Sequence, residues 1–320
     1  MPAARAERGP AAAELVEAAV AGSPRAVARL ISLVEDGGPR VREVMGLLAP
    51  RAGSAYVVGL TGAPGVGKST STSALVSAYR SRGATVGVLA VDPSSPFTGG
   101  ALLGDRVRMQ EHAGDAGVFI RSMASRGHLG GLSATTPQAL RVLSAAGCDV
   151  VLVETVGVGQ AEVEVAALAD TTLVLLAPGM GDGIQASKAG ILEVADVLVV
   201  NKADRDGAEA TARQLRHALS LTSSRAWTPP VLRTVASRGD GIAAVVDAVA
   251  EHRAWQERTG ALARRRTARA SAEVEAVALA LLRARLGDLR GGTQLPWLAT
   301  EVVAGRLDPF AAADRLVGSL

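Results

Sequence analysis

The chain has 320 residues, of which 48% are hydrophobic and only 2% aromatic, and its formal net charge is +3. Such scarce aromatic residues disfavour a stacking platform for single-stranded nucleic acid, and a mildly positive charge is not the dense basic patch of a DNA-binding protein. The single cysteine, Cys148, excludes an intrachain disulfide framework and a multi-cysteine zinc site. No apolar run reaches the roughly 18 residues that span a bilayer. We expect a soluble, cytoplasmic protein that binds neither nucleic acid nor membrane.

The predicted elements follow three successive patterns along the chain. Residues 11–48 read as amphipathic helices interrupted at Gly-Ser-Pro and Gly-Gly-Pro. Short apolar runs then alternate with helical stretches, and each run has the length and branched-residue content of a buried strand. These runs are residues 55–62, 85–92, 117–122, 149–154, 171–178, 196–202 and 230–237. Strands buried on both faces and separated by helices are typical of a doubly wound, mainly parallel α/β sheet.

After about residue 243 the pattern is wholly helical. We therefore predict an N-terminal helical extension (1–50), a nucleotide-type α/β domain (51–256) and a C-terminal helical arm (257–320). We expect the Arg-rich stretch 261–270 to be a solvated helix face. An arm of this kind cannot bury an apolar face alone, so its apolar residues need either the core or a second chain. These residues are Val274, Val277, Leu281 and Leu282.

The segment GAPGVGKST matches the P-loop pattern G-x-x-x-x-G-K-[ST] and lies between a predicted strand and a predicted helix, the context that the motif requires. Backbone N–H groups of such a loop bind a phosphate chain. We expect Lys68 to bridge the β- and γ-phosphates and Ser69 to be a Mg²⁺ ligand. The predicted nucleotide-binding residues are Gly62, Ala63, Pro64, Gly65, Val66, Gly67, Lys68, Ser69 and Thr70.

The tetrapeptide NKAD, which follows the sixth predicted strand, favours a guanine nucleotide. The carboxylate of Asp204 can accept from the ring N–H and the exocyclic amine of guanine, a donor pair that adenine lacks. Lys202 can lie over the base, and Asn201 can tie neighbouring loops. We therefore predict that GTP and GDP, rather than ATP, are the ligands.

A second base-binding loop is predicted at VASRGDG, which begins at Val235. Its backbone N–H groups, in particular that of Ala236, are expected to cover the guanine beside Ser237. Val235 stands where such loops more often carry serine, which is tolerable if only the backbone is used.

The sequence ETVG, residues 154–157, has the spacing of the D-x-x-G switch with glutamate in the first place. We expect the carboxylate of Glu154 to hold a metal-bound water or the attacking water, and the N–H of Gly157 to sense the γ-phosphate. A plain junction between a strand and a turn is the alternative. Gln160 is a weaker candidate for positioning water, since it lies three residues beyond the glycine.

Two further carboxylates and three loops complete the candidates. Asp92 ends a predicted strand before a Pro-Ser-Ser-Pro turn, where it could also cap that turn, and Asp105 follows it in the same loop. The loop after Asp92 is expected to be mobile, and residues 125–131 are expected to form a second flexible loop. The Gly-rich segment 177–190 is either a third mobile element or an ordinary irregular loop. Three arginines near these loops are more easily read as structural: Arg108, Arg121 and Arg126.

In their order and spacing, these motifs resemble the methylmalonyl-CoA mutase-associated GTPase family, also called the MeaB/ArgK family. The matching segments are GAPGVGKSTST, VDPSSPFTGGALLGDRVRM, RGHLGGLS, ETVGVGQAE, NKADRDG and DPFAAADRL. The resemblance runs from about residue 15 to the end of the chain. Its most specific features are the Pro-Ser-Ser-Pro segment and the glutamate of the switch, whereas Val235 and the Gly- and Ala-rich segment 177–188 depart from it.

The resemblance implies a homodimeric GTPase that is a chaperone of an adenosylcobalamin-dependent acyl-CoA mutase, such as methylmalonyl-CoA mutase. Hydrolysis would gate loading and exchange of the cofactor. The catalytic residues would be Lys68, Asp92, Asp105, Glu154 and Gly157, and the Mg²⁺ shell would combine Ser69 with the three carboxylates. Gln185 and Lys188 would respond to the mutase, and the C-terminal helices would carry the dimer contact.

Three alternatives remain open from the sequence. A nickel-delivery GTPase would need a cluster of metal ligands, but the four histidines and the one cysteine are scattered. A small-molecule kinase would need an acceptor pocket that the sequence does not reveal. A regulator that binds GTP without hydrolysing it is the third alternative, if Glu154 does not support hydrolysis.

Overall fold

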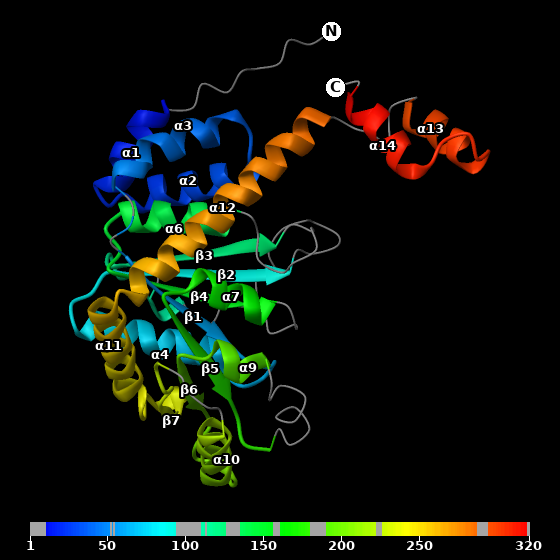
Figure 1. Ribbon diagram of the computed structural model, residues 1–320. Helices are drawn as coiled ribbons and strands as arrows, with labels where there is room; N and C mark the ends of the chain where they lie inside the picture. Colours follow the sequence, from blue (N-terminus) through cyan, green and yellow to red (C-terminus); the bar gives the residue numbers. More distant parts are fainter. Residues whose placement is uncertain are drawn as a thin grey trace. The chain divides into compact units, whose positions relative to one another are not determined.

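The computed structural model describes residues 11–51, 53, 55–93, 110–112, 114–125, 135–155, 161–179, 190–221, 226–286 and 294–318. Within these ranges seven parallel strands form one sheet in the order β3-β2-β4-β1-β5-β6-β7 (Figure 1). Their bounds are β1 Tyr56–Thr61, β2 Val86–Pro93, β3 Val118–Ser125, β4 Val150–Thr155, β5 Thr171–Leu176, β6 Val197–Val200 and β7 Val231–Arg233. The predicted doubly wound parallel sheet is confirmed, and each predicted strand overlaps an observed one.

Helices cover the sheet and form both ends of the described chain, as predicted. The N-terminal helices break before Pro24 and Pro39, which occupy first-turn positions where the missing N–H of proline costs nothing. The helices are α1 Ala12–Val20, α2 Pro24–Asp36, α3 Pro39–Leu48, α4 Lys68–Ser81, α6 Thr136–Ala145, α7 Ala161–Leu168, α9 Gly190–Val194, α10 Ala208–Ser220, α11 Ile242–Thr259, α12 Ala261–Leu286, α13 Gln294–Val303 and α14 Pro309–Gly318. Short 3-10 turns lie at Ala49–Arg51, Gln110–His112 and Ala236–Arg238.

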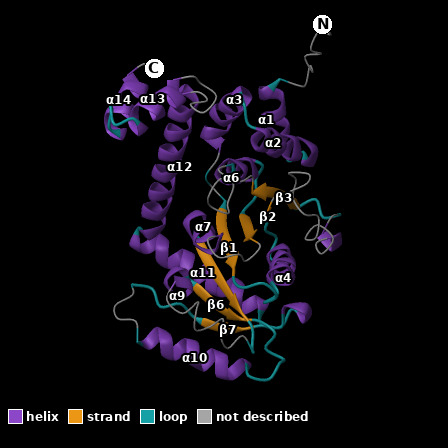
Figure 2. Ribbon diagram, turned by 90° about the vertical axis from the view of Figure 1, so that its right-hand side faces the viewer, coloured by secondary structure: helices purple, strands orange, loops and turns teal. Residues whose placement is uncertain are grey.

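The alternation of side chains along each strand divides the core between the two faces of the sheet. In β4, Val151 and Val153 pack with α1, α2, α3 and α6, whereas Val150 and Leu152 pack with α4 and α11. Figure 2 shows α4 on one side of the strands and α7 and α9 on the other. Because Glu154 lies two residues after Leu152, the same alternation turns it toward the face that α4 covers.

The N-terminal helices are also held to the sheet by polar contacts. The guanidinium of Arg121, in β3, donates 2.8 Å hydrogen bonds to the hydroxyl of Ser32 and the carboxylate of Glu35, both in α2. The structural interpretation of Arg121 is therefore confirmed. Cys148 is buried as predicted, and burial raises the pKa of its thiol to about 12, which makes it inert.

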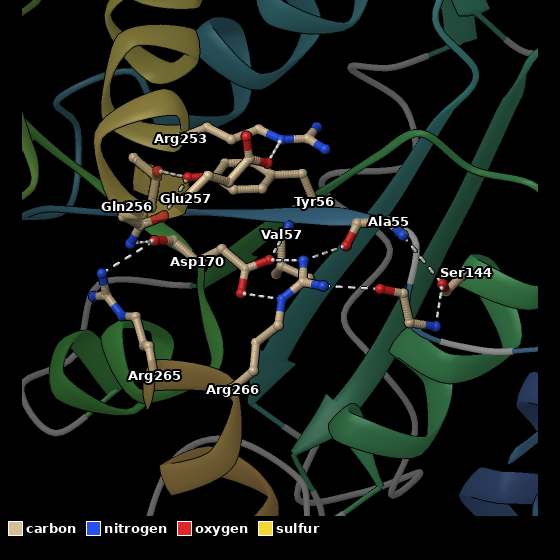
Figure 3. Close-up of polar contacts among 12 residues, drawn as sticks. Ala55, Tyr56, Val57, Ser144, Asp170, Arg253, Gln256, Glu257, Arg265 and Arg266 are labelled. Carbon is tan, nitrogen blue, oxygen red and sulfur yellow. Dashed lines mark hydrogen bonds and ion pairs between the residues drawn. The ribbon is translucent and has the colours of Figure 1, made fainter. Parts of the chain in front are cut away.

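A polar cluster lies at the amino ends of β1 and β5, the edge opposite the predicted phosphate loop (Figure 3). Its centre is the fully buried carboxylate of Asp170, which accepts from the backbone N–H of Val57 at 3.0 Å and from the guanidinium of Arg266 at 2.7 Å. Arg266 also donates to the backbone oxygens of Gly53 and Ala55. The cluster thus fastens the beginning of α12 to the first strand of the sheet.

This cluster overturns part of the prediction for the Arg-rich stretch 261–270. Arg265 donates to the backbone oxygen of Asp170 and to the carboxylate of Asp196, and it is 28% exposed, about as much as Arg266. A solvated face was expected because arginines spaced along a helix look the same in a sequence whether or not buried carboxylates face them. The prediction was wrong for these two side chains.

By its internal contacts the chain divides into two units, residues 1–266 and 267–320. The second unit comprises most of α12 together with α13 and α14. Within the described ranges no helix is both long enough and apolar enough to cross a membrane. The boundaries placed at residues 50 and 256 from the sequence stay predictions.

We expect Asp170→Asn to lower the free energy of unfolding by about 3 kcal/mol, because it leaves the guanidinium of Arg266 without its buried counter-charge. Chemical denaturation measures the effect. Glu209→Gln is the matched control, since it removes an exposed partner of Arg216 and is expected to cost under about 1 kcal/mol. Equal losses in the two variants would contradict the role given to Asp170.

Candidate nucleotide-binding site

The loop from β1 to α4 has the backbone that the P-loop motif predicts. Gly62 has a φ of 142°, and a Cβ at this position would lie 2.3 Å from the backbone oxygen of Leu175. Gly67 has a φ of 97°, and its Cβ would lie 2.5 Å from the amide nitrogen of Asn201. A side chain at either glycine would therefore clash with a neighbouring segment, which explains the glycines at both ends of the loop.

Helix α4 begins at Lys68, directly after the left-handed Gly67. The first N–H groups of a helix have no partner inside the helix, and together with the helix dipole they favour an anion. The ammonium of Lys68 donates to the backbone oxygens of Gly62 at 2.7 Å and Ala63 at 3.2 Å, so it lies across the mouth of the same loop. Helix end and ammonium together make a site suited to phosphate.

Asn201 joins the P-loop to the loop after β7. Its amide nitrogen donates to the backbone oxygen of Val66 at 2.9 Å. Its amide oxygen accepts from the hydroxyl of Thr234 and from the backbone N–H of Ala236, both at 3.1 Å. The side chain is buried, so three segments distant in sequence depend on one amide. This arrangement is the tie between loops expected of Asn201.

The two charged residues that follow Asn201 lie at the surface of the same edge. Lys202 has a left-handed backbone, with φ of 57°, and its ammonium donates to the backbone oxygen of Gly65 at 2.6 Å. The side chain of Lys202 therefore reaches the P-loop, and its place over the base stays a prediction. Asp204 is exposed, as a carboxylate that is to accept from guanine must be.

The loop of Val235, Ala236 and Ser237 is in contact with the side chain of Asn201. Val235 is buried and its N–H donates to the backbone oxygen of Asp240, which explains why an apolar residue is acceptable there. The N–H of Ala236, expected to cover the base, donates to the amide oxygen of Asn201. Its role toward guanine stays a prediction.

Glu154 touches the helix that leaves the P-loop. The hydroxyl of Ser69, the expected Mg²⁺ ligand, donates to one carboxylate oxygen of Glu154 at 2.6 Å. Both side chains are buried. These two residues are 85 positions apart in the chain, and the fold brings them into direct contact. Because a hydroxyl and a carboxylate are hard oxygen donors, the pair has the chemistry that Mg²⁺ prefers.

No motif of the sequence indicates Thr72. Its hydroxyl donates to the second carboxylate oxygen of Glu154 at 2.8 Å, and its side chain is fully buried. Thr72 lies three residues after Ser69, so the two side chains share a face of α4. This spacing in the hydroxyl-rich stretch KSTSTS was the available signal, but nothing in the sequence showed that the face meets β4.

The remaining predicted residues are only partly within the structure. Pro64 and Thr70 are exposed. Asp92 lies in β2 with its backbone paired to Ala124, but its side chain is outside the described set. Several candidates lie wholly outside the described residues: Asp105, Arg108, Arg126, Gly157, Gln160, Gln185 and Lys188. Among the residues that are described, no three His, Cys, Asp or Glu side chains gather as they would around a metal ion.

Known proteins resemble the chain over most of its length. A protein of Pyrococcus abyssi, provisionally named as a GTPase, is 46% identical and covers 95% of both chains. The GTPase ArgK of Escherichia coli is 39% identical over 75% of this chain and 76% of its own. The mouse mitochondrial protein named methylmalonic aciduria type A homolog is 35% identical over 93% of this chain and 77% of its own.

The fold has a solved counterpart as well. The crystal structure of a LAO/AO transport system kinase matches 96% of both chains, with a TM-score of 0.71 and 27% sequence identity. The family model described as methylmalonyl Co-A mutase-associated GTPase MeaB matches residues 27–288. The chain is therefore a P-loop GTP hydrolase and belongs to the methylmalonyl-CoA mutase-associated GTPase (MeaB) family.

Proposed function

We propose that this GTPase is a chaperone of an adenosylcobalamin-dependent acyl-CoA mutase, methylmalonyl-CoA mutase or a close relative, and that GTP hydrolysis with Mg²⁺ gates loading and reactivation of the cofactor. The observation that carries the chemical part is the contact between the hydroxyl of Ser69 and the carboxylate of Glu154 at the P-loop helix. The family description, which names a mutase, supports the chaperone part.

Different residues of the chain would bind the phosphates, the base and the metal. The ammonium of Lys68 and the first N–H groups of α4 would bind the β- and γ-phosphates. Asp204 would select guanine, with Lys202 over the base and the loop of Val235, Ala236 and Ser237 beside it. Bound Mg²⁺ would neutralise charge that develops on the phosphate oxygens. Ser69 and Glu154 would hold the metal, together with Asp92 and Asp105, and the N–H of Gly157 would contact the γ-phosphate.

The contacts of Glu154 favour one of its two proposed roles. Its carboxylate touches Ser69, whose hydroxyl is the expected metal ligand, so it lies beside the metal position. A carboxylate in hydrogen bonds with a metal ligand typically acts as an outer-shell partner of the metal. We therefore assign Glu154 to the water of the metal and not to the attacking water.

We expect Glu154→Gln to slow GTP hydrolysis roughly tenfold or more, the scale seen when an outer-shell partner of a metal is lost. At saturating Mg²⁺ the affinity for GDP should change little, because the phosphates are bound by Lys68 and the P-loop backbone. Phosphate release and binding of a fluorescent GDP analogue measure the two effects. Glu209→Gln, at an exposed position in α10, is the control. An unchanged hydrolysis rate would remove the role assigned to Glu154.

The chaperone role predicts that an adenosylcobalamin-dependent mutase stimulates hydrolysis. Intrinsic turnover should be slow, and it should rise when the mutase is added to the chain with GTP and Mg²⁺. Phosphate release with and without the mutase measures this, with ATP replacing GTP as the nucleotide control. Turnover that the mutase does not change, or a preference for ATP, would contradict the proposal.

We also propose that two copies of the chain form a homodimer. The apolar side chains of α12 that the sequence singled out are 44–70% exposed: Val274, Val277, Leu281 and Leu282. A row of exposed aliphatic side chains on one helix is an unfavourable surface for a single chain in water. We expect light scattering to give twice the 32.5 kDa mass of the chain. A mass of one chain at micromolar concentration would contradict the dimer.

The alternatives are less well supported. A nickel-delivery function needs a cluster of soft or imidazole ligands, and the described part of the chain holds no such group. A small-molecule kinase would transfer the γ-phosphate to an acceptor, so the phosphate-release measurement distinguishes it from the hydrolase.

A further inference from the structure

We propose that Thr72 is a positioning residue that fixes the carboxylate of Glu154 against Ser69, and thereby sets how strongly the site binds Mg²⁺ with its nucleotide. The proposal rests on the nucleotide site and the role of Glu154 proposed above. Thr72 itself would touch neither the nucleotide nor the metal, so it would act only through Glu154.

The geometry joins one helix face to one strand end. Ser69 and Thr72 lie one turn apart on α4, and their hydroxyls donate to the two different oxygens of Glu154 at 2.6 and 2.8 Å. Thr72 is 0% exposed and Glu154 3% exposed, so water does not compete for these hydrogen bonds. Both oxygens of the carboxylate are thus held, which fixes the rotation of the carboxylate about the Cγ–Cδ bond of Glu154.

The hydroxyl of Thr72 has a choice of acceptors but only one proton to donate. It lies 2.8 Å from the carboxylate of Glu154 and 3.1 Å from the backbone oxygen of Lys68, its neighbour one turn earlier in α4. A hydrogen bond to an ionised carboxylate is shorter and about twice as strong as one to a neutral carbonyl. The hydroxyl of Thr72 therefore donates its proton to the carboxylate of Glu154.

This arrangement gives the glutamate of the switch a physical reason. Glu154 reaches from the end of β4 to two hydroxyls of α4, and an aspartate would draw the carboxylate back by one methylene. Each oxygen of a carboxylate can accept more than one hydrogen bond, so the bonds to Ser69 and Thr72 do not by themselves exclude a metal-bound water. Without the hydroxyl of Thr72, the buried carboxylate would lose a donor and could turn away from Ser69.

The test compares Thr72→Val, which keeps the shape and removes the donor, with Thr72→Ser, which keeps the donor. Each variant is titrated with Mg²⁺ in the presence of a fluorescent GDP analogue. The readout is the Mg²⁺ concentration that gives half of the metal-dependent increase in binding of the analogue. We expect Thr72→Val to raise this concentration on the order of tenfold, as for a lost charge-assisted hydrogen bond, and to lower kcat without a matching change in KM. Thr72→Ser should keep this Mg²⁺ concentration and kcat at the values of the unaltered chain. The affinity for GDP without Mg²⁺, measured in the presence of a chelator, should not change in either variant.

Two control experiments distinguish a positioning role of Thr72 from a purely structural role. Thr211→Val removes a largely buried hydroxyl of α10, which donates to the backbone oxygen of Gly207 at 3.0 Å in the same helical pattern, and it should leave the Mg²⁺ dependence unchanged. In a Glu154→Gln chain, Thr72→Val should add little further loss, because the two changes remove one interaction. If Thr72→Val unfolds, Thr72→Ala against Thr72→Ser gives the same comparison.

Two outcomes would overturn the proposal in distinguishable ways. If Glu154→Gln shifts the Mg²⁺ dependence but Thr72→Val does not, or if Thr72→Ser behaves like Thr72→Val, Thr72 does not position the carboxylate and the proposed function stands. If the unaltered chain shows neither Mg²⁺-dependent GDP binding nor GTP hydrolysis, the proposed function fails, and the role of Thr72 fails with it.

Discussion

The contact between Glu154 and α4 depends on the parallel pairing of β1 with β4. Leu60 pairs with Glu154 in this register, so the end of β4 stands beside the beginning of the P-loop. Side-chain alternation then turns Glu154 toward α4, where Ser69 and Thr72 donate to its two oxygens. A slip of one residue would turn the carboxylate to the opposite face of the sheet. The chemistry proposed for this chain therefore requires the register of its central strands.

The two edges of the sheet are used differently. At the carboxyl ends of the strands, one amide, that of Asn201, ties the P-loop to the loop after β7, and charged groups reach the surface. At the amino ends, the buried carboxylate of Asp170 ties β1 to the start of α12. Parallel strands make this division possible, because all their carboxyl ends meet at one edge. The first edge offers groups to a ligand, whereas the second satisfies its polar groups internally.

Motifs of the sequence identified the first edge well and the second poorly. The P-loop glycines, Lys68 and Asn201 could be predicted because their roles depend on local backbone form and on a fixed order along the chain. The pairs of Arg265 with Asp196 and of Arg266 with Asp170 could not, because they join residues 69 and 96 positions apart by packing alone. Thr72 escaped notice for the same reason, since a hydroxyl on a helix gains a meaning only from what it faces.

The sequence by itself determined the class of sheet, the helical ends, the phosphate loop and the preference for guanine, because each of these follows from periodicity or from a short run of adjacent residues. Tertiary structure alone decided that Glu154 meets Ser69 and Thr72, and that two arginines of α12 neutralise carboxylates of the α/β core. Contacts of this kind depend on strand order and helix placement. These are set by burial of the whole core and not by any local stretch of sequence.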